Sequence, residues 1–112
     1  MRNQVSSLQP QRDPVVRAFA TALRQQLGPQ LRQILLFGSR ARGDAQDGSD
    51  YDMLVVVDSR TPELRAVILE VERQLMERYG ALVATVLHSE AEWQQAQGLP
   101  LARNIAREGV PL

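Results

Sequence analysis

Residues 36–43 read LFGSRARG, and residues 49–57 read SDYDMLVVV; these two segments decide the fold. The apolar run that ends at Phe37 indicates a strand. Gly38 and Ser39 then indicate a tight turn, with Ser39 as the N-cap of a short helix that ends near residue 43. The unbroken apolar run of the second segment indicates a strand that is covered on both faces. The pattern therefore predicts strand, turn, short helix, polar loop and buried strand.

The predicted turn between the first strand and the short helix has the features of an anion site. Gly38 lacks a Cβ, so a ligand can approach its backbone closely. Ser39 offers a hydroxyl beside free N–H groups at a helix start, where phosphate is favoured. Arg40 and Arg42 add positive charge nearby, although arginine on a short exposed helix is equally consistent with plain surface. We therefore predict phosphate binding at this turn.

Two carboxylates mark the start of the second strand. Asp50 and Asp52 are two residues apart, so both side chains project from one face of the strand, about 7 Å apart along it. Asp is depleted in strands, which makes two on one face of an apolar strand unusual. Mg²⁺ prefers such oxygen ligands and is commonly shared with substrate phosphates. An anion cradle beside a divalent-cation site predicts a site for a nucleoside triphosphate.

The combination of Gly38-Ser39, ten intervening residues and Asp50-Tyr51-Asp52 resembles the signature of the DNA-polymerase-β-like nucleotidyltransferase superfamily. The longer pair of segments, residues 38–44 and 49–56, is similar to the minimal nucleotidyltransferase family. This resemblance implies ATP as substrate, Mg²⁺ as cofactor, and an α/β fold in which helices pack on a small mixed three-stranded sheet. It also implies catalytic and metal-binding roles for Asp50 and Asp52, and nucleotide contacts from Gly38, Ser39, Arg40 and Arg42.

The rest of the chain supplies the elements of such a fold. Helices are predicted from Pro14, with Asp13 as N-cap, and from Pro62, with Thr61 as N-cap. Residues 82–87 are predicted to form a third apolar strand, followed by a capping box, a short helix and a last helix over 100–108. The expected order is αβαβαβα, and residues 110–112 are expected to form a tail. We expect a flexible N-terminal arm over residues 1–12 and a single nucleotidyltransferase domain over residues 13–112.

Composition excludes several classes of function. Lys plus Arg and Asp plus Glu each number 13 in 112 residues, so no global basic field favours a large nucleic acid. The chain has no cysteine, which excludes a thiolate metal site and a disulfide framework. No apolar run approaches the ~18 residues of a membrane span. We therefore expect a cytoplasmic protein that does not bind a membrane.

The third strand departs from the family pattern. Relatives commonly carry a third acidic residue there, but this strand has none, and Leu82 stands where an Asp is often found. Glu90 and Glu92 follow the strand and are open to a role as metal ligands, but helix-start preference for Glu90 and the capping box for Glu92 are the favoured explanations. His88, the single histidine, is open to either a nucleotide contact or a structural role.

These observations leave two hypotheses of different classes. The resemblance implies the antitoxin of a toxin–antitoxin pair that transfers AMP from ATP to a tyrosine hydroxyl of a HEPN-domain toxin. The alternative is a catalytically weak or inactive nucleotide-binding protein that regulates its partner by direct contact. The intact Gly38-Ser39 and Asp50-Tyr51-Asp52 segments favour the first hypothesis, and the acid-free third strand favours the second. A transferase for a small molecule is a third hypothesis, which the lack of an evident acceptor pocket disfavours.

Overall fold

The computed structural model describes residues 10–46 and 48–112, so most of the predicted N-terminal arm lies outside the described residues. The order of elements along the chain is as follows: η1 (Pro10–Arg12), α2 (Pro14–Leu27), η2 (Gly28–Gln30), β1 (Leu31–Phe37), α3 (Ser39–Arg42), β2 (Tyr51–Val57), α4 (Pro62–Tyr79), β3 (Val83–Ser89), α5 (Glu90–Ala96), α6 (Pro100–Glu108) and β4 (Val110–Pro111). The predicted mixed α/β fold is confirmed. None of the helices in these ranges combines the length and apolar character that crossing a membrane requires.

The sheet has the order β3-β2-β1-β4, one strand more than predicted. Strand β1 pairs antiparallel with β2 and with β4, whereas β2 pairs parallel with β3. The fourth strand is the segment that we expected to be a tail. It was missed because two residues carry no periodicity, and the pairing with Leu35 and Leu36 is a tertiary contact.

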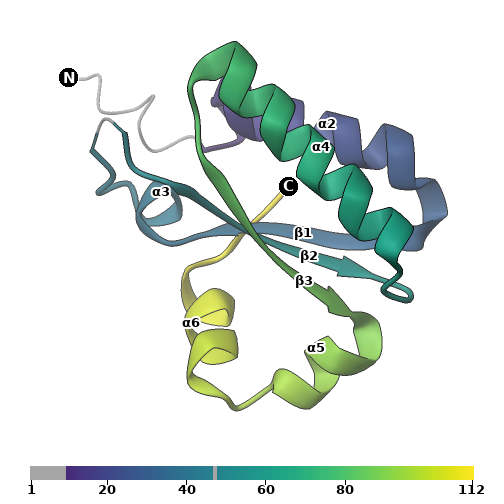
Figure 1. Ribbon diagram of the computed structural model, residues 1–112. Helices are drawn as coiled ribbons and strands as arrows, with labels where there is room; N and C mark the ends of the chain where they lie inside the picture. Colours follow the sequence, from purple (N-terminus) through teal and green to yellow (C-terminus); the bar gives the residue numbers. More distant parts are fainter. Residues whose placement is uncertain (1–9, 47) are drawn as a thin grey trace.

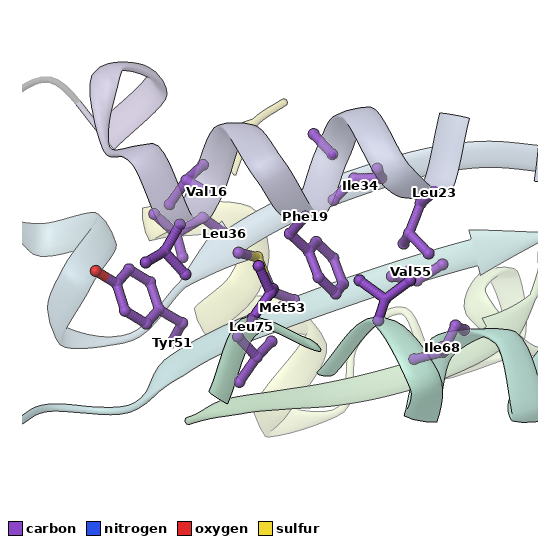
Figure 2. Close-up of a cluster of buried hydrophobic side chains, with 14 of the residues drawn as sticks. Val16, Phe19, Leu23, Ile34, Leu36, Tyr51, Met53, Val55, Ile68 and Leu75 are labelled. Atoms are coloured by element: carbon purple, nitrogen blue, oxygen red, sulfur yellow. The ribbon is translucent and has the colours of Figure 1, made fainter. Parts of the chain in front are cut away.

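Helices α2 and α4 cover one face of the sheet, and α5 and α6 lie against the other (Figure 1). The first face holds the larger core, in which Phe19 of α2 and Ile68 of α4 meet Met53 and Val55 of β2 (Figure 2). The second face holds a smaller core made by Leu35, Leu54, Val56 and Ile105. The prediction that β2 is covered on both faces is confirmed, because Leu54 and Val56 point to one core and Met53 and Val55 to the other.

The helix caps follow the sequence closely. Asp13 accepts a hydrogen bond from the Val15 N–H at 2.8 Å, and the Thr61 hydroxyl accepts one from the Leu64 N–H at 3.1 Å. Ser89 and Glu92 form the predicted capping box. The prediction of Ser39 as a cap is wrong by one residue: Gly38 is the N-cap of α3, and Ser39 is its first helical residue. This N-cap position has a positive φ, which glycine adopts readily because it lacks a Cβ.

Candidate nucleotide and metal site

Strand pairing brings Gly38 and Asp52 together. Phe37, the last residue of β1, lies opposite Asp52 of β2, so the chain turns into Gly38 directly beside the Asp52 side chain. A Cβ built on Gly38 would overlap the Oδ2 atom of Asp52. Gly38 also has φ 77° and ψ −160°, a region that is almost restricted to glycine. The predicted turn and one of the predicted carboxylates therefore touch, and the contact requires glycine.

The two carboxylates differ in their surroundings. Asp50 is exposed and precedes β2, whereas Asp52 is half-buried within it. Burial raises the pKa of the Asp52 carboxyl, and the nearby negative charge of Asp50 raises it further, while Arg42 opposes the shift. A bound cation would stabilise the ionised form of Asp52 in this negative environment.

The third strand adds no carboxylate to this face. Ala84 of β3 pairs with Asp52, and Leu82 lies one residue before the Val83–Tyr51 pair. Leu82 is exposed, and its carbonyl accepts a hydrogen bond from the Tyr51 N–H at 2.9 Å. Over the described ranges, no group of three or more His, Asp or Glu side chains is arranged to hold a metal ion. A metal at Asp50 and Asp52 would therefore take its remaining ligands from water and phosphate oxygens, as Mg²⁺ commonly does.

The two arginines predicted to contact the nucleotide have different surroundings. The Arg40 guanidinium donates two hydrogen bonds to the Ser49 carbonyl, at 3.0 and 3.2 Å, and lies 4.3 Å from the centroid of the Tyr51 ring. The Tyr51 hydroxyl donates in turn to Asp13 at 2.7 Å. Arg40 therefore ties the loop between α3 and β2 to the Tyr51 face of the sheet.

Arg42 remains nearer the carboxylates. Its guanidinium pairs with Asp44 at 3.1 Å and with Glu108 at 3.3 Å, and the hydrogen bonds with Asp44 and then Glu108 raise the pKa of Arg42. The Arg42 side chain is 47% exposed, and its charge acts on Asp52. The pair with Asp44 is exposed on both sides, and such pairs contribute little to stability, so Asp44 is readily exchanged for another anion.

Glu108 is a member of this group that the sequence did not reveal. Its Oε1 atom accepts a hydrogen bond from the Gly38 N–H at 2.9 Å, although the two residues are 70 positions apart. The register explains the contact: Leu36 pairs with Val110 in an antiparallel ladder, so continuing it by two residues on each strand places Gly38 opposite Glu108. Predicting this contact requires knowing that β4 pairs with β1, and the sequence pattern does not show β4.

Glu90, Glu92 and His88 contact other parts of the chain. Glu90 pairs with Arg32 at 3.5 Å, and Glu92 pairs with Arg60 at 2.8 Å in addition to its place in the capping box. The ring of His88 lies 6.1 Å from that of Trp93, centroid to centroid, on the face of the smaller core. None of these contacts joins the group around Gly38 and Asp52.

Known proteins resemble this chain in sequence and in fold. The family of the nucleotidyltransferase domain matches residues 16–109. A Methanocaldococcus jannaschii protein, MJ0604, named as a candidate protein adenylyltransferase, is 28% identical over 97 residues, which are 87% of this chain and 93% of the relative. A second protein of that organism with the same designation, MJ1305, is 33% identical over 72 residues, 62% of this chain and 49% of the relative.

Solved structures share the fold. A toxin–antitoxin crystal structure with AMP-PNP superposes with a TM-score of 0.61 at 24% identity and covers 85% of this chain and 69% of the other. A candidate nucleotidyltransferase from Sulfolobus solfataricus gives a TM-score of 0.51 at 23% identity and covers 96% and 80% of the two chains. Together with the match over residues 16–109, these findings confirm the resemblance seen in the sequence. This chain belongs to the nucleotidyltransferase domain family.

Proposed function

We propose that this chain is the antitoxin of a toxin–antitoxin pair and transfers AMP from ATP, with Mg²⁺, to a tyrosine hydroxyl of a HEPN-domain toxin. The observation that carries the proposal is the contact of Gly38 with Asp52, because it brings the predicted anion-binding turn against one of the two predicted metal ligands. The names of its relatives give further support: two are candidate protein adenylyltransferases, and one solved neighbour is a toxin–antitoxin structure with AMP-PNP.

Each group in the site has a proposed role. Asp50 and Asp52 hold the metal, which would supply charge to offset the negative charge that develops on the phosphates. Gly38 and Ser39 contact the triphosphate of ATP. Arg42 leaves its exposed ion pair with Asp44 and contacts a phosphate instead. Arg40 remains a proposed nucleotide contact, but it would first have to leave the Ser49 carbonyl and the Tyr51 ring, so we rank it below Arg42.

In the proposed reaction the acceptor oxygen bonds to the α-phosphorus of ATP. The bond from that phosphorus to the bridging oxygen breaks, pyrophosphate leaves, and the hydroxyl proton passes to water. Holding the reacting groups in line and stabilising the developing charge are the main contributions of such a site.

The second candidate is an antitoxin that acts by contact alone. The observation that favours it is the third strand, where Leu82 and Ala84 stand beside the carboxylate face and neither is acidic. A protein of this kind would keep the fold and bind its partner without transferring AMP.

Intact-mass spectrometry separates the two candidates. A HEPN-domain protein is incubated with this chain, ATP and Mg²⁺, and the wild type is compared with the Asp50→Asn/Asp52→Asn variant. A mass gain of one or more AMP units with wild type only supports the transferase. A stable complex with both proteins and no mass gain refutes the transferase and leaves the contact-type antitoxin.

A further inference from the structure

Glu108 contacts the proposed site at two points. Its carboxylate accepts hydrogen bonds from the Gly38 N–H at 2.9 Å and from the Arg42 guanidinium at 3.3 Å to each oxygen. The Glu108 side chain is only 17% exposed, in contrast to 60% for Asp44, the other partner of Arg42. This combination of a backbone donor, a paired cation and burial gives the Glu108 carboxylate a fixed place.

The bond to Gly38 matters because the Gly38 backbone is strained and tightly packed. A φ of 77° with a ψ of −160° persists only when the surroundings impose it. The Gly38 carbonyl accepts the N–H groups of Ala41 and Arg42, both at 3.0 Å, so its own N–H is the point where α6 can hold the turn. A hydrogen bond to a carboxylate is about twice as strong as one between neutral groups.

We propose that Glu108 is a positioning residue of the nucleotide site, which holds the Gly38 backbone against Asp52 and orients Arg42 toward the same face. The inference rests on the proposed nucleotide-binding function of Gly38, Ser39, Asp50 and Asp52. It assigns to the C-terminal helix and to β4 the task of fixing a turn that lies 70 residues earlier in the chain.

Two other roles for Glu108 fit the structure less well. As a metal ligand it would have to join Asp50 and Asp52, but no such group of three forms within the described part of the chain. As an internal competitor it would occupy a donor that a phosphate needs, and its removal would then tighten nucleotide binding. The pairing with Arg42 argues against this second role, because Arg42 offsets part of the negative charge that would repel a phosphate.

The test uses Glu108→Ala, which removes both contacts, and Glu108→Gln, which keeps an oxygen that can accept the Gly38 N–H. Glu90→Ala is the matched control, because Glu90 also pairs with an arginine but lies away from the turn. AMP-PNP with Mg²⁺ is titrated into each protein by calorimetry, and hydrogen exchange at the Gly38 amide is followed by NMR.

We expect Glu108→Ala to weaken AMP-PNP binding about tenfold, equivalent to ~1.4 kcal/mol, and to accelerate exchange at Gly38 more than at Leu35 in the preceding strand β1. Glu108→Gln is expected to retain most of the affinity, and Glu90→Ala to match the wild type. Faster exchange at unchanged affinity would overturn the inference, because Glu108 would then be only structural. Tighter binding of Glu108→Ala would overturn it in favour of competition.

Failure of the proposed function gives a different result. A wild type that binds no AMP-PNP refutes the nucleotide site itself, and the role of Glu108 is then decided by the Gly38 amide alone. Acceleration confined to Gly38 and its neighbours keeps Glu108 as the positioning residue of the turn, whereas unchanged exchange overturns that role as well.

Discussion

The substitution Gly38→Ala tests the contact on which the site is built. An L-residue at φ 77° and ψ −160° costs on the order of 1–3 kcal/mol. The new Cβ would also overlap Oδ2 of Asp52, although it would lie at a tolerable 3.4 Å from the Asp52 Cβ. The carboxylate can relieve the overlap by rotating away, at a cost of roughly 0.5–1.5 kcal/mol if it leaves its rotamer.

Thermal unfolding followed by circular dichroism measures the sum of these costs. At about 4 °C per kcal/mol for a domain of this size, the backbone strain alone lowers Tm by roughly 4–12 °C. Gly28→Ala is the matched control, since Gly28 also has a positive φ, of 57°, but a Cβ there would meet nothing within 4 Å. Gly38→Ala is therefore expected to be the more destabilising of the two.

A double-mutant cycle with Asp52→Ala isolates the contact. Removing the Asp52 carboxylate also removes the overlap, so Gly38→Ala should cost less in the Asp52→Ala background than in the wild type. Independent sites add to within about 0.5 kcal/mol, which sets the threshold for a real coupling. An additive cycle, with Gly38→Ala no worse than Gly28→Ala, would refute the packing of the turn against Asp52.

Four further predictions follow from other contacts. Asp52→Asn should raise Tm at neutral pH without metal, because burial and Asp50 raise the pKa of Asp52. The unfavourable charge develops only as pH rises through that pKa, so the advantage of Asn should vanish in acid; an advantage that persists there would contradict this cause. Tyr51→Phe should cost roughly 1.5–3 kcal/mol through loss of the hydroxyl bond to Asp13, measured by urea unfolding; an unchanged midpoint would contradict it. Burial and Asp13 raise the pKa of Tyr51 to about 12, so ultraviolet titration should show one of the two tyrosines ionising late, and native stability should fall between pH 10 and 12. Ile68→Ala should cost about 2–5 kcal/mol in the same unfolding assay, since Ile68 is fully buried in the larger core, and a loss below 1 kcal/mol would contradict that packing.

Local chemistry made most of the fold predictable. The Asp13-Pro14 and Thr61-Pro62 helix starts, the capping box and the two covered faces of β2 each depend on residues a few positions apart, and the structure has them as predicted. The apolar face of the last helix was less well predicted. The i, i+4 spacing of Leu101 and Ile105 favours a shared apolar face, but Leu101 is 48% exposed, and Ala102 is buried beside Ile105. Packing against the sheet, rather than hydrophobicity alone, decides which of these neighbouring residues are buried.

The candidate site was predictable only in part. The spacing between Gly38-Ser39 and Asp50-Tyr51-Asp52 located the turn and the carboxylates, because both sit at the ends of strands that pair with each other. It did not show that Arg40 faces Tyr51, since a cation beside a turn can point either way. Nor did it show Glu108, whose contact depends on a two-residue strand.

The metal-dependent binding of a nucleotide is the central claim, and calorimetry tests it most directly. AMP-PNP is titrated into the wild type with Mg²⁺, into the wild type with EDTA, and into the Asp50→Asn/Asp52→Asn variant with Mg²⁺. We predict saturable binding by the wild type with Mg²⁺, weakened at least about tenfold in the other two titrations, which corresponds to ~1.4 kcal/mol or more. Equal affinity in all three titrations, or no binding by the wild type, would contradict the assignment of the site.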